Sequence, residues 1–374
     1  MFLSYEGREN QEEIFEEAEE AYKKNREKFE KEFDFKNTIF KGDNFSVLAT
    51  LLNGGMKGKI DLIYIDPPFA TDSNFTYEKG RVRTISSSKK AKVAYSDTLK
   101  DEVFLEFLRK RLLLLRELLS EKGSIYLHID YKVGHYVKII MDEVFGTENF
   151  LNDISRIKSN PKNFGRKAYG NEKDMILFYA KKRGKNIFNN ITIPFTDEEL
   201  KEKFKKVDSD GRRYNTVPVH APGESNGVTG QKWKGMEPPA GRHWRTSPEK
   251  LSELDSEGKI EWSKTGNPRL KKYADESNRK GKKMQDIWTS YKDPSRPTYP
   301  TEKNYKMLKM IVEQSSNEKS WVLDAFGGSG TTGKAAAELG RKFILIDQSN
   351  VAIKLEREFF ESDLFESTDF ISFS

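Results

Sequence analysis

Two short motifs, each placed directly after a run of apolar residues, limit what this chain can fold into more than any other feature. Residues 61–65 lead into Asp66-Pro67-Pro68-Phe69, and residues 321–324 lead into a glycine-rich segment at 326–330. Each run has the length and composition of a buried strand, and each is followed by turn-forming residues. The two segments therefore predict strands of an α/β protein that present chemical groups at their carboxyl ends.

The rest of the chain repeats this alternation of strand and helix. An amphipathic helix is expected at residues 10–33, where Ile14, Ala18, Phe29 and Phe33 recur at helical spacing. The later segments follow the rhythm that a doubly wound, mostly parallel sheet requires. We expect strands at residues 38–40, 61–65, 123–130, 321–324 and 342–347, and helices at residues 45–52, 102–119, 305–313 and 332–339.

The regular pattern breaks after residue 154 and returns near residue 291. The segment between them starts with a basic stretch and continues with Gly-, Pro-, Trp- and Arg-rich residues, which are typical of irregular loops. Residues 151–290 hold 30 Lys and Arg against 19 Asp and Glu, whereas residues 1–34 hold 6 against 12. The net charge of the whole chain is only +6. The middle of the chain is thus predicted to bind a polyanion.

Composition excludes several classes of function. The 374 residues contain no cysteine, which rules out disulfides, thiolate metal sites and thiol nucleophiles. The four histidines lack metal-ligand spacing, so we expect no metal site. No apolar run approaches the ~20 residues that span a bilayer, and the N-terminus has no signal-peptide pattern. A soluble, cytoplasmic protein with no membrane partner is expected.

The glycine-rich segment suits a nucleoside cofactor. Gly328 and Gly330 allow the backbone to turn sharply and to approach a ligand closely. Asp347 closes the next strand, where a carboxylate can accept hydrogen bonds from both ribose hydroxyls. A third glycine and a Gly-Lys-Ser/Thr sequence are missing, which argues against a dinucleotide or a triphosphate. S-adenosylmethionine, which has no phosphate, fits better.

Taken together, the two motifs resemble those of the amino-methylating DNA methyltransferases. The catalytic motif precedes the cofactor motif, which is similar to the circularly permuted order of the beta class. The resemblance covers most of residues 36–360 and implies a Rossmann-like methyltransferase sheet with an inserted target-recognition domain. Its expected parts are an N-terminal helix at 1–35, a catalytic part at 36–154, a target-recognition insert at 155–290 and a cofactor-binding part at 291–374.

The resemblance also implies roles for single residues. Asp66 and the carbonyl of Pro67 accept the two N–H groups of an exocyclic amine, Pro68 stiffens the turn, and Phe69 stacks on a base flipped out of double-stranded DNA. Asp43 either contacts the target base or the cofactor adenine, or it is an ordinary helix N-cap. The expected cofactor-binding residues are Asp324, Phe326, Gly328, Gly330, Thr331 and Asp347, with Thr301 and Lys303 at the cofactor carboxylate.

Basic side chains of the insert are candidates for phosphate contacts, with solvated surface charge as the alternative for most of them. They are Lys158, Lys162, Arg166, Lys167, Arg269, Lys271, Lys272, Lys282 and Lys283.

The expected function is site-specific adenine-N6 methylation of double-stranded DNA in a restriction-modification context. Cytosine-N4 methylation is the alternative within the family, although its enzymes usually carry Ser where Asp66 stands. Related enzymes that methylate RNA or a protein glutamine usually carry Asn there, and a non-catalytic DNA-binding subunit predicts decay of one motif. Cytosine-C5 methylation is excluded because it needs a cysteine. A homodimer and a restriction subunit are the protein partners that we consider.

Overall fold

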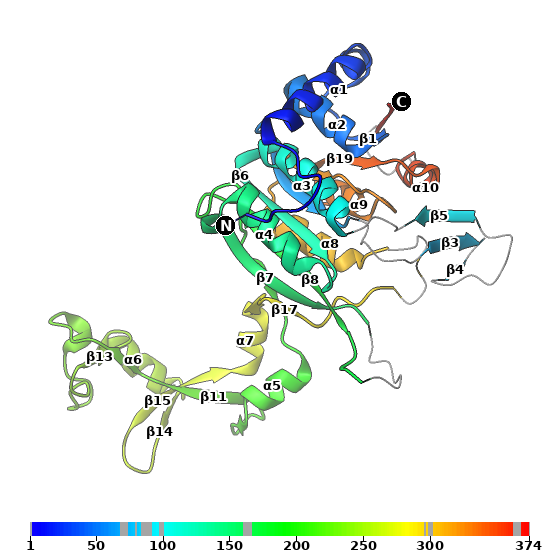
Figure 1. Ribbon diagram of the computed structural model, residues 1–374. Coiled ribbons are helices and arrows are strands. Elements are labelled where there is room, and N and C mark those ends of the chain that lie inside the picture. Colours follow the sequence, from blue (N-terminus) through cyan, green and yellow to red (C-terminus); the bar gives the residue numbers. More distant parts are fainter. Residues whose placement is uncertain are drawn as a thin grey trace. The chain divides into compact units, whose positions relative to one another are not determined.

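The chain folds into two compact units in this computed structural model (Figure 1). The structure describes residues 2–67, 74–78, 81–83, 92–96, 101–159, 167–294, 297, 302–361 and 368–373. Unit 1 comprises Met1–Asn190 and Gln285–Ser374, and unit 2 comprises Ile191–Met284.

Unit 1 is built on a nine-stranded sheet with the order β17-β7-β8-β6-β2-β18-β19-β1-β20. The six strands from β6 to β20 in this order run parallel to one another, whereas β8 is antiparallel to both of its neighbours, β6 and β7. Strand β17 is parallel to β7. The predicted doubly wound α/β fold is confirmed. The strands are β1 (Thr38–Lys41), β2 (Ile60–Ile65), β6 (Leu119–Ile129), β7 (Phe150–Ile157), β8 (Lys173–Ala180), β17 (Ile287–Trp288), β18 (Trp321–Asp324), β19 (Lys342–Asp347) and β20 (Asp369–Ser372), and a separate three-stranded sheet holds β3 (Asn74–Glu78), β4 (Arg81–Arg83) and β5 (Lys92–Ser96).

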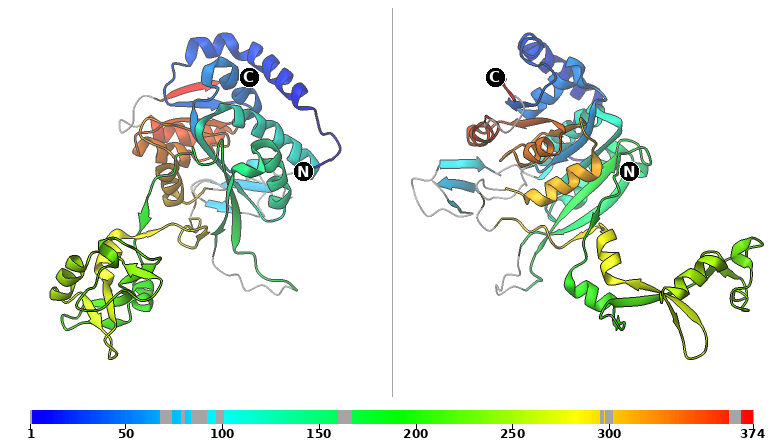
Figure 2. Two further views of the ribbon diagram at one scale, coloured as in Figure 1. Left: turned by 90° about the vertical axis from the view of Figure 1, so that its left-hand side faces the viewer. Right: turned by 180° about the vertical axis from the view of Figure 1, so that it is seen from behind.

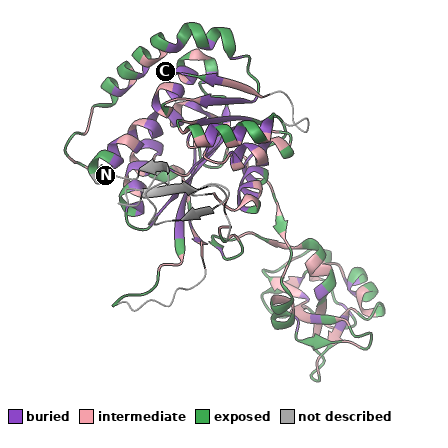
Figure 3. Cartoon of the chain, turned by 90° about the vertical axis from the view of Figure 1, so that its right-hand side faces the viewer, coloured by how far each residue is buried: buried purple, intermediate pink, exposed green. Residues whose placement is uncertain are grey.

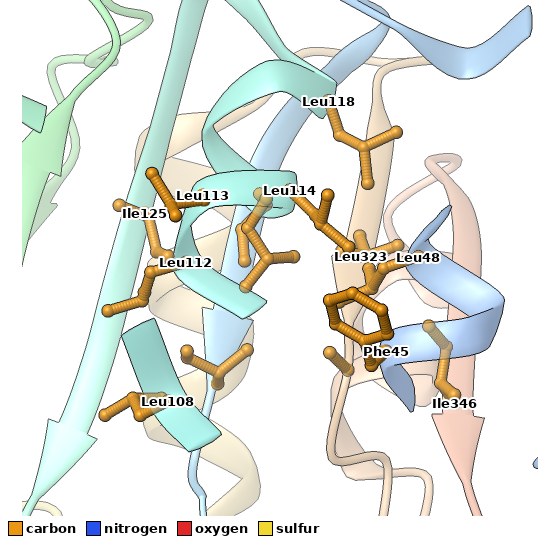
Figure 4. Close-up of a cluster of buried hydrophobic side chains, with 14 of the residues drawn as sticks. Phe45, Leu48, Leu108, Leu112, Leu113, Leu114, Leu118, Ile125, Leu323 and Ile346 are labelled. Atoms are coloured by element: carbon orange, nitrogen blue, oxygen red, sulfur yellow. The ribbon is translucent and has the colours of Figure 1, made fainter. Parts of the chain in front are cut away.

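Helices cover both faces of the parallel strands (Figure 2). Successive side chains of a strand point to opposite faces of the sheet, and both faces are apolar here, so each needs a layer of helices to bury it. Ile63, Ile125 and Leu323 belong to the apolar core of unit 1. Figure 4 shows Ile125 and Leu323 in one cluster with leucines of α3 and with Leu48 of α2. On the other face, the Tyr126 hydroxyl lies 2.8 Å from Ser315 Oγ of α8. The helices are α2 (Asn44–Leu51), α3 (Asp101–Leu118), α4 (Gly134–Phe145), α8 (Tyr305–Ser315), α9 (Thr331–Glu338) and α10 (Asn350–Phe360), with short helical turns at Leu52–Met56 and Thr147–Asn149.

The expected N-terminal amphipathic helix is α1 (Gln11–Glu32). Ile14, Ala18 and Phe29 are buried on one side of it and join the core of unit 1. Asn25 on the same side donates a hydrogen bond to Thr50 Oγ1 of α2 at 3.4 Å. The helix therefore uses its apolar face within its own chain.

Unit 2 has a small apolar core, and most of its residues are exposed or half-buried (Figure 3). Val219, Trp233, Trp244, Leu251 and Ile260 form this core. Its elements are β9 (Thr192–Ile193), α5 (Asp197–Lys203), β10 (Lys206–Val207), β11 (Arg213–Pro218), β12 (His220–Pro222), a helical turn at Val228–Gly230, β13 (Arg242–Trp244), α6 (Pro248–Ser256), β14 (Ile260–Trp262), β15 (Pro268–Tyr273), α7 (Ala274–Lys280) and β16 (Lys282–Lys283).

The predicted insert, residues 155–290, differs from unit 2 at both ends. Residues 155–190 contain most of the β7–β8 hairpin, and β17 pairs with β7, so these segments belong to the sheet of unit 1. An antiparallel hairpin interrupts the strand–helix rhythm here. The bounds of the target-recognition insert stay a prediction. The separate unit is Ile191–Met284.

Among the described residues, no helix is long and apolar enough to cross a membrane. No group of acidic and histidine side chains in the same part of the chain is arranged to hold a metal ion.

Candidate active site

Asp66 follows β2 at the edge where the parallel strands end. Its Oδ2 lies 2.8 Å from Lys303 Nζ, and only 13% of the Asp66 side chain and 11% of the Lys303 side chain are exposed. Its Oδ1 is buried and accepts no hydrogen bond from any described residue. The carboxylate is thus held by a cation on one oxygen and retains a vacant acceptor on the other.

His128, at the end of β6, lies behind this vacant acceptor, with Nδ1 3.8 Å from Asp66 Oδ1. Nε2 is 3.0 Å from Asp174 Oδ2, and Nδ1 is 3.0 Å from the Tyr64 hydroxyl. Burial lowers the pKa of His128 and the charge of Lys303 lowers it further, so the ring is neutral near pH 7. Because a carboxylate only accepts, the hydrogen bonds assign the proton to Nε2, and Tyr64 donates to Nδ1. His128 therefore has no proton to donate to Asp66.

Asp174 holds the His128 ring on the side away from Tyr64. Its Oδ1 lies 2.6 Å from Lys158 Nζ, and its Oδ2 lies 3.6 Å from an amino group of Arg156, which is fully buried and also pairs with Asp293. Burial alone would raise the pKa of Asp174, but the His128 hydrogen bond and the Lys158 charge lower it well below its ordinary value. Asp174 stays ionised and fixes the orientation of the histidine ring.

The glycine-rich turn joins β18 to α9 at the same edge of the sheet. Asp324 accepts hydrogen bonds from the Phe326 amide at 2.9 Å and the Thr332 hydroxyl at 2.6 Å. Asp347, at the end of β19, accepts from the Gly328 amide at 2.9 Å and the Ser349 amide at 2.7 Å. Gly328 has a φ of +56°, in the left-handed region that suits glycine. The turn therefore depends on both a carboxylate and a glycine.

Sequence reasoning missed a third acid behind this turn, Glu356 of α10. The side chain is fully buried, and neither oxygen has a hydrogen-bond partner among the described residues. A Cβ atom on Gly327 would lie 2.7 Å from its Oε1, so a larger residue at position 327 would displace the Glu356 carboxyl group. Burial raises the pKa of Glu356 well above its ordinary value, and Asp347 and Asp324 raise it further. An acid on an amphipathic helix gives no sequence signal of such burial.

The acids at this edge repel one another. Burial raises the pKa of Asp324 to about 7, and the charges of Asp66 and Asp347 contribute to the increase. Burial also raises the pKa of Asp347. Because a positive charge nearby would stabilise the ionised forms, the site favours a cationic ligand over an anionic one.

Asp43 occupies the helix-cap position that was one of its two expected roles. Its Oδ2 accepts a hydrogen bond from the Ser46 amide at 3.0 Å, and its Oδ1 lies 2.9 Å from Arg111. The Arg111 guanidinium stacks 3.5 Å above the Phe107 ring, whose centre is 6.2 Å from that of Phe326. A cavity of about 770 Å³ between α1, α2 and α3 is lined in part by Asp43, Phe107 and Arg111. A ligand contact for Asp43 stays a prediction.

The structure brings Asp66, Lys303, Asp324 and Asp347 to one edge of the sheet, with Pro67 buried beside Asp66. The hydroxyl of Thr331 lies 2.7 Å from that of Ser329 at the start of α9. Some predicted site residues lie outside the described residues: Pro68, Phe69, Lys162, Arg166 and Thr301.

The other predicted DNA-binding side chains differ in how their charge is compensated. Lys158 pairs with Asp174, and Lys282 pairs with Glu199, which makes both less suited to phosphate than expected. Arg269 donates to the Thr216 hydroxyl at 2.8 Å. The remaining ones are Lys167 and Lys272, which are exposed, Lys271, whose Nζ is 5.2 Å from the Tyr214 ring, and Lys283 of β16.

Fold and site together define a doubly wound α/β protein with a buried carboxylate beside an acidic, glycine-lined turn. The family model described as DNA methylase matches residues 60–358. The type II methyltransferase M.EcaI of Enterobacter cloacae is 41% identical over 360 residues, which cover 94% of this chain and 76% of that protein. The chain belongs to the DNA methylase family.

Two further relatives are more distant. The EcoP15I Mod subunit, a type III restriction-modification enzyme of Escherichia coli, is 26% identical over 81% of this chain and 56% of that protein. The type II methyltransferase M.KpnI of Klebsiella pneumoniae is 26% identical over 85% of this chain and 82% of that protein.

Proposed function

We propose that this DNA methyltransferase transfers a methyl group from S-adenosylmethionine to the N6 amino group of an adenine flipped out of double-stranded DNA. The observation that carries the proposal is the Asp66 carboxylate, with Oδ2 held by Lys303 and Oδ1 buried and vacant. A buried carboxylate oxygen without a hydrogen-bond donor is suited to accept an N–H group of the bound base.

The chemistry requires such an acceptor. The lone pair of an exocyclic amine is delocalised into the base, so the amine is a weak nucleophile. If Asp66 Oδ1 accepts one N–H and the Pro67 carbonyl accepts the other, the nitrogen becomes more tetrahedral and its lone pair points toward the methyl donor. His128 supports this role because its neutral ring presents no competing proton to Asp66. The base must leave the helix to reach this position.

S-adenosylmethionine fits the chain's residues at the glycine turn. It carries a sulfonium cation and no phosphate, which agrees with the mutual repulsion of Asp66, Asp324 and Asp347. A carboxylate can accept about four hydrogen bonds, so Asp347 retains capacity for the ribose hydroxyls. When bound, the cofactor supplies the electrophilic methyl group. The proposed contacts are Asp324, Phe326, Gly328, Gly330, Thr331 and Asp347, with Lys303 and Thr301 at the cofactor carboxylate.

The choice of adenine rests on Asp66-Pro67-Pro68-Phe69, which resembles the adenine enzymes more than the cytosine-N4 enzymes. A restriction-modification context is proposed from the relatives, because the EcoP15I Mod subunit is named as part of such a system. Unit 2 is proposed to recognise the DNA target, since it separates from the methyltransferase sheet as a small module.

Mass spectrometry of nucleosides tests the proposal after the protein has reacted with S-adenosylmethionine and unmethylated genomic DNA. N6-methyladenine is the expected product, and Asp66→Ala should abolish it. Asp61→Asn is the matched control, because Asp61 sits at the other end of β2 and accepts hydrogen bonds from Ser120 and Ser320 at 2.7 Å each. N4-methylcytosine as the only product would overturn the choice of base, and full activity of Asp66→Ala would overturn the catalytic assignment.

A further inference from the structure

Three arginines of unit 2 gather around one histidine. Strands β12 and β13 pair antiparallel, and the Arg242 guanidinium on β13 lies 3.2 Å from His220 Nδ1 on β12. Arg245 follows β13 directly, and Arg269 lies on β15 opposite Pro218. Burial lowers the pKa of His220, and the charges of all three arginines lower it further, so all three lie within electrostatic range of the ring.

Neutral groups hold these arginines in place. Arg245 Nε donates to the carbonyls of Pro218 and His220, each at 3.1 Å. Arg269 donates through Nε to the Thr216 hydroxyl at 2.8 Å and through a terminal nitrogen to the Thr216 carbonyl at 2.9 Å. Among the described residues, which include all of unit 2, none of the three arginines forms an ion pair with a carboxylate. Their geometry is fixed while their charge is not compensated.

Several other cations of unit 2 pair with a carboxylate. Lys206 pairs with Glu261, and Arg212 lies 3.0 Å from a carboxylate oxygen of Asp275. The arginine cluster is different because none of its members forms an ion pair with an acid of the described residues. Glu261 lies opposite Arg269 across β14 and β15, but its carboxylate pairs with Lys206 and accepts a hydrogen bond from Tyr214. The cluster also lies next to the core of the unit. Trp244, between Arg242 and Arg245 in the sequence, is buried in that core and donates a hydrogen bond to the Gln231 carbonyl at 2.9 Å.

We propose that His220, Arg242, Arg245 and Arg269 form a phosphate-binding site that holds the backbone of duplex DNA. A phosphate removes the mutual repulsion and pairs with fixed guanidinium groups, whereas the neutral edge of a base would leave most of the charge uncompensated. The inference rests on the proposed function of unit 2 in target recognition. It specifies which residues of unit 2 contact the phosphates of the DNA.

Salt-dependent binding of the whole protein tests the site. Arg242→Gln, Arg245→Gln and Arg269→Gln are each compared with wild type by fluorescence anisotropy, on a duplex that the protein methylates and on a scrambled duplex of equal length. Each variant should reduce the slope of log affinity against log salt by about 0.9 and weaken both duplexes by the same factor. Arg279→Gln is the matched control, because that side chain is 76% exposed and lies 3.8 Å from Asp275. Its slope should equal that of wild type.

A second measurement does not depend on any variant folding. In protein labelled at its histidine rings, NMR follows the titration of His220 with and without duplex DNA. A bound phosphate should raise the pKa of His220, because an opposite charge favours the protonated ring.

The outcomes separate this inference from the proposed function. Three results would each overturn the phosphate site. The first is a wild-type salt slope in all three arginine variants, and the second is a loss of affinity confined to the duplex that the protein methylates. The third is a His220 titration that does not change in the complex. DNA binding by wild type that is independent of salt would instead contradict the role of unit 2 in DNA recognition, and the site with it.

Discussion

The Nζ atom of Lys303 lies 2.8 Å from Oδ2 of Asp66, although the two residues come from opposite ends of the sequence. Burial by itself would lower the pKa of Lys303, but Asp66, Asp293 and Asp174 together raise it above its ordinary value, so the lysine keeps its charge throughout the neutral range. The pair therefore places a cation against one oxygen of Asp66 at a site where the charges of other acids are also close.

Removal of Lys303 should lower the rate of catalysis. In Lys303→Met the buried Asp66 carboxylate loses the cation that holds its Oδ2, and breaking a buried ion pair by removing one partner is strongly unfavourable, so turnover should fall by at least about tenfold. The measurement is turnover at saturating cofactor and DNA. Lys303→Arg keeps the positive charge and should retain more of the wild-type turnover than Lys303→Met. Wild-type turnover in Lys303→Met would show that the ion pair does not support Asp66.

Cofactor affinity should depend on pH through Asp324. Its pKa of about 7 means that the carboxylate is partly protonated at neutral pH, and a cationic ligand binds the ionised form better. Affinity should therefore rise as pH increases toward 7, by at most about tenfold per pH unit, and level off above it. Calorimetry from pH 5.5 to 8.5 checks this, with proton release on binding as a second sign. Asp324→Asn should remove the dependence, and a flat wild-type curve would contradict the prediction.

Asp347→Asn should weaken S-adenosylmethionine binding by about 2–4 kcal/mol, because the charged acceptor for the ribose hydroxyls is lost. The amide can still accept the hydrogen bond from the Gly328 amide, so the turn should persist. Calorimetry at pH 8, with Asp61→Asn as the control, gives the difference. An affinity equal to that of the control would remove Asp347 from the cofactor site.

The core under α3 should be sensitive to truncation. Leu112 is fully buried and packs in the cluster of unit 1 (Figure 4). Leu112→Ala should lower the free energy of unfolding by about 2–5 kcal/mol through lost burial and a residual cavity. Chemical denaturation followed by circular dichroism measures the change, and Lys354→Ala, whose side chain is 78% exposed, should stay within about 0.5 kcal/mol of wild type. A similar small effect for Leu112→Ala would place that residue outside the cooperative core.

Prediction from sequence worked best where strands are buried on both faces. The apolar runs before Asp66, Asp324 and Asp347 became β2, β18 and β19, because such strands read as continuous apolar segments. Because functional groups gather at the carboxyl ends of parallel strands, the three acids that follow these strands lie at one edge of the sheet. The charges of Asp66 and Asp347 act on Asp324 there.

Prediction failed where a strand runs the other way. Asp174 lies at the amino end of β8, and β8 is antiparallel to β6, so this end meets the carboxyl end of β6 beside His128. No rule based on parallel strands would select it. The same hairpin lies between the start of the predicted insert, at residue 155, and the start of unit 2, at Ile191.

The sequence by itself determined the α/β fold, the acids at its strand ends and the glycine turn, because local periodicity and turn chemistry encode them. Only the tertiary structure decided which charges meet: Lys303 with Asp66, Lys158 with Asp174, and the arginines around His220. The reason is physical. Charge compensation depends on distances of a few ångströms between residues that are far apart in the chain, and sheet topology sets those distances rather than residue spacing.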